Sequence, residues 1–142
     1  MTLLRELLQV KGSLVYTISP EATLAEVVDR LNDHNCGSLV VCQDGRMVGI
    51  ITDRDILRAC AKLNGAMDQA RVADHMTRDV ITGTPEDRVA EVMGLMTDKR
   101  IRHLPLLEGG NLCGLISIGD VVKAQHQQVC VENYYLKSYI QS

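Results

Sequence analysis

The chain has few aromatic residues, no long apolar run and no excess of positive charge. Phenylalanine and tryptophan are absent, and tyrosine occurs four times. A protein that stacks single-stranded bases needs more aromatic side chains, and a net charge of −3 argues against a nucleic-acid surface. No apolar run has membrane-spanning length, and the first ten residues lack a secretory signal pattern. These absences predict a cytoplasmic protein that binds neither nucleic acid nor membrane.

Metal-ligand spacing is absent as well. The five cysteines form no C-x-x-C pair and are odd in number, which favours buried, reduced thiols over a zinc site. The four histidines are scattered along the chain. We therefore expect no metal and no covalent cofactor, and a redox sensor that uses the cysteines is the alternative.

What the sequence does contain is one unit that occurs twice. Val80 lies 65 positions after Val15, and the same offset aligns identical residues through turns, helices and strands without a gap. A unit of this size buries little surface alone, so the two copies are expected to share one core. The aligned identities include Thr17/Thr82, Pro20/Pro85, Glu26/Glu91, Val27/Val92, Leu39/Leu104, Gly49/Gly114, Ile51/Ile116 and Asp55/Asp120.

The apolar pattern predicts the order β-α-β-β-α in each copy, and hence an α/β fold. In the first copy, Thr23 and Glu26 form a capping box at a helix start, and Asp44-Gly45 is a hairpin turn. Its expected strands are 15–18, 39–42 and 47–51, and its second helix is 55–63. The predicted domains are an N-terminal helix (1–12), repeat one (13–65), a connector with a helical turn at 72–76 (66–78), repeat two (79–125) and a helical tail (126–142).

Each copy closes on Gly-[Ile/Leu]-Ile-[Thr/Ser]-x-x-Asp, at residues 49–55 and 114–120. Thr52 and Asp55, and likewise Ser117 and Asp120, stand where an apolar strand turns into a helix. A carboxylate accepts two hydrogen bonds and so matches the vicinal hydroxyls of a ribose, while a helix N-terminus favours an anion. The same spacing is also that of a helix cap, and both interpretations stay open.

These motifs resemble those of tandem cystathionine β-synthase (CBS) domains, a pair also called a Bateman module. The resemblance rests on P-x-x-[TR]-[LV]-x-E-V and the closing motif in both copies, and it covers roughly residues 13–125. It implies two repeats packed as one intramolecular pair with pseudo-two-fold symmetry. The chain looks like a small stand-alone member of this class.

The resemblance further implies a regulatory module without catalytic activity. Such modules bind AMP, ADP, ATP, NAD(H) or S-adenosylmethionine between the repeats and signal to a partner protein, commonly as homodimers. By motif position, Asp55 and Asp120 would bind ribose hydroxyls. The side chains that would contact the ligand's hydroxyl or phosphate groups are Thr52, Ser117, Arg102, His103, Arg54 and Lys123. A weaker prediction is an adenine slot made of Tyr16, Thr17, Ile18 and Thr82.

The two copies differ where phosphate would be held. Arg102 and His103 align with the uncharged Gly37 and Ser38, so two equivalent nucleotide sites are not expected. Gly119 leaves room for a ligand to approach closely beside Asp120, which favours the strand-to-helix junction at Ser117 and Asp120 as the better site. Asp120→Ala is therefore expected to weaken adenylate binding more than Asp55→Ala does.

The C-terminal tail permits two interpretations. Val122, Val129, Leu136 and Ile140 recur roughly on one helical face, and three of the four tyrosines lie in this segment. The helix can pack on its own domain, or it can form a dimer contact, for which tyrosine is well suited. An alternative function is thus an interaction protein that works through its tail. An enzyme is not expected, because no nucleophile–base spacing and no P-loop is present.

Overall fold

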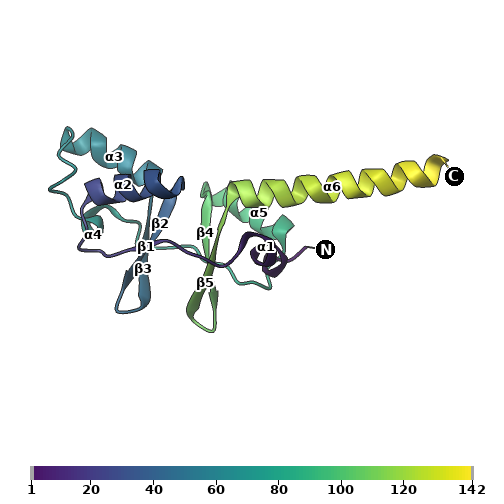
Figure 1. Ribbon diagram of the computed structural model, residues 1–142, viewed down its shortest axis with the longest axis horizontal. Helices are drawn as coiled ribbons and strands as arrows, with labels where there is room; N and C mark the ends of the chain where they lie inside the picture. The colour runs from purple at the N-terminus through teal and green to yellow at the C-terminus, as the bar shows by residue number, and fades with distance from the viewer. Residues whose placement is uncertain (1, 142) are drawn as a thin grey trace. The chain divides into compact units, whose positions relative to one another are not determined.

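The computed structural model describes residues 2–141, and the chain divides into two compact units (Figure 1). One unit, Leu14–Ile81, holds the first repeat and is called the first-repeat unit. The other joins the N-terminal segment up to Ser13 to the chain from Thr82 onward and is called the second-repeat unit. The connector therefore belongs with repeat one, whereas the N-terminal helix belongs with repeat two.

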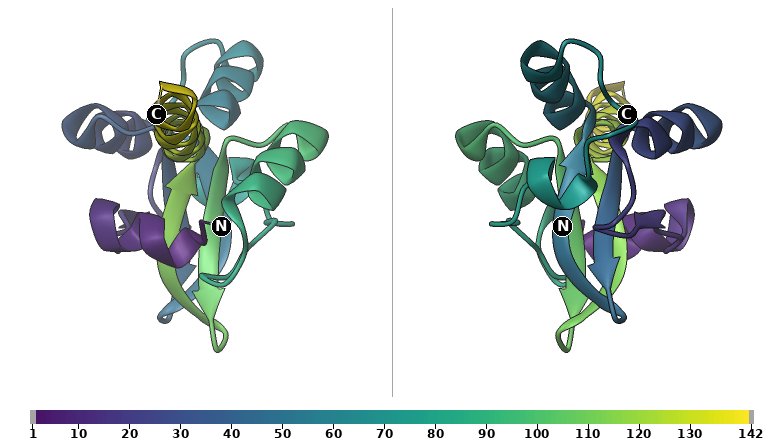
Figure 2. Two further views of the ribbon diagram at one scale, coloured as in Figure 1. Left: turned by 90° about the vertical axis from the view of Figure 1, so that its right-hand side faces the viewer. Right: turned by 90° about the vertical axis from the view of Figure 1, so that its left-hand side faces the viewer.

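The first-repeat unit packs helices on a small mixed sheet (Figure 2). The sheet has the order β1-β2-β3, with β1 parallel to β2 and β2 antiparallel to β3. Its core includes Leu24 and Val27 from the first helix and Leu39, Val41 and Ile51 from the strands. The elements are β1 (Thr17–Ile18), α2 (Leu24–His34), β2 (Ser38–Gln43), β3 (Arg46–Thr52), α3 (Asp53–Leu63) and α4 (Val72–His75).

Local sequence signals set the ends of these helices. The predicted capping box is confirmed: Thr23 Oγ1 accepts from the N–H of Glu26 (3.2 Å), and the Glu26 carboxylate accepts from the N–H of Thr23 (3.2 Å). Asn35 caps the C-terminus of helix α2 and adopts a left-handed conformation with φ of 49°. Asp44 and Gly45 form the predicted turn, both with positive φ.

The second-repeat unit contains α1 (Leu4–Lys11), α5 (Val89–Lys99), β4 (His103–Glu108), β5 (Asn111–Ser117) and α6 (Ile118–Gln141). Strands β4 and β5 form an antiparallel hairpin that pairs Leu104 with Ile116. Figure 2 shows α1 and α5 over this hairpin. The buried side chains of the unit include Leu4, Val92, Met96, Leu104, Leu106, Ile116 and Val121.

The first strand predicted for repeat two is not formed as a strand. Only an isolated parallel bridge joins Gly83 to Leu106, through hydrogen bonds from the Gly83 N–H to Pro105 (3.0 Å) and from the Leu107 N–H to Gly83 (2.9 Å). Gly83 occupies the position that Ile18 has in repeat one. Glycine weakens strand structure because it brings no side chain to pack, so the ladder shortens to this bridge.

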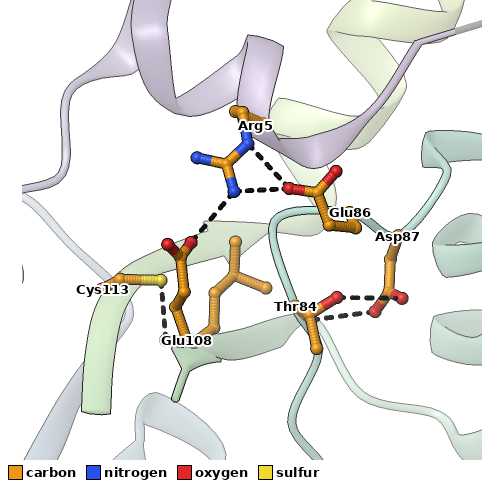
Figure 3. A network of polar contacts seen from close by, with 7 residues as sticks. Arg5, Thr84, Glu86, Asp87, Glu108 and Cys113 are labelled. Atoms are coloured by element: carbon orange, nitrogen blue, oxygen red, sulfur yellow. Dashed lines mark hydrogen bonds and ion pairs between the residues drawn. The ribbon is translucent and has the colours of Figure 1, made fainter. Parts of the chain in front are cut away.

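Helix α1 is anchored on the second repeat, as Figure 3 shows around Arg5. Its guanidinium makes ion pairs with Glu86 and with Glu108, the latter at 3.0 Å. The N–H of Leu4 donates to the carbonyl of Asp87 (2.9 Å), and the Leu4 side chain is fully buried. The helix, Leu4–Lys11, lies within the segment 1–12 that was predicted to be helical.

Helix α6 continues without a break from the second repeat into the tail. Every residue from 129 to 140 is exposed. No helix in the described part of the chain is both long enough and apolar enough to cross a membrane.

The expectation of buried cysteines is wrong for Cys60 and Cys130, which are exposed. Cys60 lies on the outward face of α3, and Cys130 lies in the exposed part of α6. Cys36, Cys42 and Cys113 are half-buried, and all five thiols are free.

Candidate functional site

The strand-to-helix corner is built in the same way in both units. The N–H of Asp53 donates to the carbonyl of Gly37 (2.9 Å), and at the aligned positions the N–H of Ile118 donates to the carbonyl of Arg102 (2.8 Å). These bonds hold the first turn of α3 and of α6 beside the start of the preceding hairpin strand. The sequence motif thus produces two copies of one local geometry.

In the first-repeat unit the corner is closed around Asp55. Its Oδ2 accepts from the N–H of Thr52 (3.0 Å) and from Thr52 Oγ1 (3.2 Å), and Thr52 Oγ1 accepts in turn from the N–H of Asp55 (3.3 Å). Thr77 Oγ1 reaches both carboxylate oxygens, at 3.3 and 3.4 Å. The capping interpretation is confirmed here, and Asp55 is only 8% exposed.

Ser38 adds a buried polar atom to this corner. It pairs in register with Thr52 across the hairpin, so both side chains lie on one face of the sheet. Its Oγ is buried and finds no hydrogen-bond partner among residues 2–141. An unpaired buried hydroxyl costs about 1–3 kcal/mol, which an approaching polar group can offset.

In the second-repeat unit the corner is more open. Asp120 Oδ2 accepts from the N–H of Ser117 (2.9 Å), and Ser117 Oγ accepts from the N–H of Asp120 (3.2 Å), so the cap is again present. Lys11 Nζ lies 2.5 Å from the same Oδ2 and donates to the carbonyl of Leu115 (2.6 Å). The Asp120 side chain is 28% exposed, and the bonds from Ser117 and Lys11 both fall on Oδ2.

The charge of Lys11 sets the ionisation of this corner. Burial raises the pKa of Asp120, but the hydrogen bonds from Lys11 and Ser117 and the positive charge of Lys11 outweigh burial. The pKa of Asp120 therefore lies below its ordinary value. The corner holds an ionised carboxylate at neutral pH.

Each closing motif begins with a glycine, because a neighbouring segment lies too close to the strand to leave room for a side chain. A Cβ at Gly114 would stand 2.6 Å from Leu8 Cδ2, and a Cβ at Gly49 would stand 2.8 Å from the carbonyl oxygen of Thr77. The segment before each repeat therefore packs on the motif of the opposite repeat: α1 covers Gly114, and Met76-Thr77 covers Gly49. This exchange brings Lys11 to Asp120 and Thr77 to Asp55.

A groove of about 740 Å³ lies between α1 and α6, next to the Asp120 corner. This volume is in the range of small-molecule sites in proteins. The groove combines charged side chains with apolar ones, including Leu7, Val10 and Lys11 from α1 and Asp120, Lys123 and Val131 from α6.

The structure brings five of the predicted residues together at this corner. His103 pairs in register with Ser117, and Arg102 is joined to the first turn of α6 through its carbonyl. Lys123 lines the groove with Lys11 and Asp120. Arg102 and Lys123 are exposed, and His103 is half-buried.

The other predicted residues lie in different surroundings. Arg54 is exposed on α3, whereas Ile18 packs in the core of the first-repeat unit. The ring of Tyr16 stacks on His34 with centroids 3.7 Å apart, and Thr17 accepts a hydrogen bond from Arg30 at its carbonyl. Thr82 is half-buried and belongs to the second-repeat unit. The adenine slot stays a prediction.

Lys11 and Thr77 are the residues that sequence reasoning missed. Both stand just before a repeat, and the 65-residue offset aligns Lys11 with Met76 and Gly12 with Thr77. That alignment could have marked the two segments as equivalent. Among residues 2–141, no three His, Cys, Asp or Glu side chains gather as a possible metal site.

Comparison with known proteins gives consistent results. A family model described as the CBS domain matches residues 13–62 and 72–127. The mitochondrial CBS domain-containing protein CBSX3 of Arabidopsis thaliana is 40% identical over 124 residues, which are 84% of this chain and 60% of that protein. The CBS domain-containing protein YhcV of Bacillus subtilis is 34% identical, over 78% of this chain and 79% of its own length.

Solved structures agree in fold. A CBS-domain-containing protein from Agrobacterium tumefaciens superposes with a TM-score of 0.85 at 39% identity, covering 87% of this chain and 99% of its own. The CBS domain pair of protein MJ0100, solved with 5′-methylthioadenosine and S-adenosyl-L-methionine, gives 0.76 at 26% identity, covering 87% and 98%. With its mixed α/β fold and repeated closing motif, the chain belongs to the CBS domain family and carries two CBS repeats.

Proposed function

We propose that this chain is a regulatory module that binds an adenosine-containing ligand at the Asp120 corner and has no catalytic activity of its own. The observation that carries the proposal is the state of Asp120: its carboxylate is ionised, partly exposed and fixed by Ser117, and the bonds from Ser117 and Lys11 both fall on Oδ2.

Such a carboxylate suits a ribose. The vicinal hydroxyls of the sugar are donors, and an ionised carboxylate accepts from both. The cap from Ser117 fixes the carboxylate before ligand arrives, which lowers the entropic cost of binding.

Cations at the same corner suit a phosphate. Lys11 and Lys123 line the groove beside Asp120, and Arg102 adjoins the first turn of α6. The N-terminus of α6 adds the positive end of a helix dipole. We therefore propose AMP, ADP, ATP or NAD(H) ahead of the sulfonium ligand S-adenosylmethionine, whose positive charge the two lysines repel.

The Asp55 corner is the weaker candidate. Both of its carboxylate oxygens already accept from Thr52 or Thr77, and the side chain is nearly buried. The unpaired Ser38 hydroxyl is the one feature there that favours a ligand. A second ligand at this corner would have to replace the bonds of Thr77.

We propose that Lys11 transmits ligand binding at Asp120 to helix α1. A ribose that takes hydrogen bonds at Asp120 changes the partner of Lys11, and Lys11 is part of α1. Ligand binding would thus alter how α1 is held on the second repeat, and a regulated partner protein would recognise that change. This is regulation by differential affinity between two states.

The test is a thermal-shift panel of adenosine, AMP, ADP, ATP, NAD, NADH and S-adenosylmethionine. Ligand at one hundred times its Kd should add about 2.7 kcal/mol, which raises the Tm by several degrees. Asp120→Asn should remove the shift, Asp120→Ala should remove it as well, and Asp55→Ala should reduce it less. Asp98→Ala, on the exposed end of α5, is the matched control and should keep the full shift.

Each outcome of this panel either supports or refutes a stated part of the proposal. A shift with one phosphorylated ligand that disappears in Asp120→Asn but not in Asp98→Ala supports both the site and the class of ligand. Equal losses in the Asp120 and Asp55 variants refute the asymmetry. No shift with any ligand refutes the proposal and favours an interaction protein that works through α6.

A further inference from the structure

One stripe of α6 is exposed along its whole length and has a regular composition. It consists of Val122, His126, Val129, Asn133, Leu136 and Ile140, called here the tail stripe. Its four apolar members are between 49% and 74% exposed. Four large apolar side chains on one helix face, interrupted by His126 and Asn133, are costly to leave in water.

The tail stripe faces away from the groove. Successive residues of an α-helix are about 100° apart, so residues spaced by four and three share one face. Of the α6 residues that line the groove, Ala124, Gln127 and Val131 lie on the opposite side of the helix, and Lys123 and Glu132 lie on its flanks. The tail stripe is therefore not the surface with which α6 meets α1.

The spacing within the stripe is that of a coiled coil. Val122, Val129 and Leu136 are seven residues apart, and His126, Asn133 and Ile140 repeat at the same interval four residues later. In heptad notation the first set occupies d and the second set occupies a. We propose that the tail stripes of two copies of this chain pair as a parallel, two-stranded coiled coil.

Charge complementarity identifies the second copy as the occupant. In a parallel pair, the residue at g faces the e residue five positions further along the other helix. Glu132 falls at g and Lys137 at e, so each Glu132 faces Lys137 of the other copy, and the pair forms twice by symmetry.

Asn133 sets the direction of the pair. A parallel arrangement places the two copies of Asn133 opposite each other, where their amides hydrogen-bond, and this is the known effect of asparagine at an a position. An antiparallel arrangement would place Asn133 opposite an apolar d residue such as Val129 or Leu136 and leave its amide unpaired. Leu136 at d is also the side chain that favours two strands.

The first test uses charge exchange. Glu132→Lys alone and Lys137→Glu alone each put like charges at both e–g contacts, so each homodimer should be about tenfold weaker than wild type. An equimolar mixture of the two variants restores opposite charges at both contacts. Native mass spectrometry should therefore show the mixed dimer as the dominant species, and a statistical mixture would overturn the parallel arrangement.

The second test removes the apolar contact. Leu136→Asp places a charge in the pair and should halve the mass that sedimentation equilibrium gives for the full-length wild-type chain. Tyr134→Asp also puts an aspartate in place of a large side chain, two residues away on an exposed position outside the tail stripe, and should leave the mass unchanged. The proposal is overturned if Leu136→Asp keeps the wild-type mass, or if both variants lose it equally.

Discussion

Replacement of Lys11 by methionine tests how the N-terminal helix is coupled to the Asp120 corner. Methionine is the residue that stands at the aligned position of the other repeat, Met76, so the change copies a side chain that this fold already accepts. It keeps the apolar stem of Lys11 and removes only the ammonium group. The expected result is a less stable second-repeat unit.

The contacts of Lys11 set the size of the effect. Its Nζ lies 2.5 Å from Asp120 Oδ2 and 2.6 Å from the carbonyl oxygen of Leu115. The two charged side chains are 35% and 28% exposed. A fully exposed ion pair contributes about 0.2–1 kcal/mol and a hydrogen bond to a charged group about 1.5–3 kcal/mol. Partial exposure places this pair between the two, at about 1–2 kcal/mol.

The assay is a double-mutant cycle by urea denaturation. Lys11→Met and Asp120→Asn should each lower the free energy of unfolding by about 1–2 kcal/mol. The double variant should lose much less than the sum, because each single change already removes the same interaction. Lys99→Met, an exposed lysine in the last turn of α5, is the matched control and should change stability by less than about 0.5 kcal/mol.

The reasoning fails under either of two results. Lys11→Met could unfold at the same urea concentration as wild type, or the losses of the two single variants could add fully in the double variant. In both cases the ion pair would contribute nothing to stability, and Lys11 could not transmit ligand binding at Asp120 to α1.

Two further predictions follow from the same units. Gly49→Ala should destabilise by about 1–3 kcal/mol because its Cβ would meet the backbone of Thr77, whereas Gly94→Ala, with open space around it on α5, should stabilise by about 0.5–1 kcal/mol; urea midpoints of opposite sign check this, and a neutral Gly49→Ala contradicts it. Because the pKa of Asp120 is lowered on folding, its contribution is present above the ordinary value of 3.8 and is lost as the pH falls through the lower folded pKa. The stability difference between wild type and Lys11→Met should therefore shrink below about pH 3.8, and a difference that stays constant to low pH would contradict the pKa shift.

Much of the fold is encoded locally and could be predicted. The capping box at Thr23, the hairpin turn at Asp44-Gly45 and the apolar strands of both hairpins form where the pattern placed them. Each depends on residues a few positions apart, and such contacts follow from backbone geometry and periodicity. The main error was the first strand of repeat two, where Gly83 shortens the ladder to a single bridge.

The site could be predicted only in part. The closing motif placed Thr52, Asp55, Ser117 and Asp120 at strand-to-helix corners, because a hydroxyl residue followed by an acid three positions later is a local capping signal. Their proposed role toward a ligand is still a prediction. The difference in exposure between Asp55 and Asp120 has no counterpart in the motif, since both copies carry the same residue types at the capping positions.

The sequence by itself determined the repeat, the family to which it belongs and the positions of the two corners. Only the tertiary structure decided that each preceding segment packs on the opposite repeat, which brings Lys11 to Asp120 and Thr77 to Asp55. These contacts join residues far apart in the chain, and nothing in a 65-residue offset states which copy a flanking helix will cover. The choice depends on where Leu4 and Leu8 can be buried, and that is a property of the assembled core.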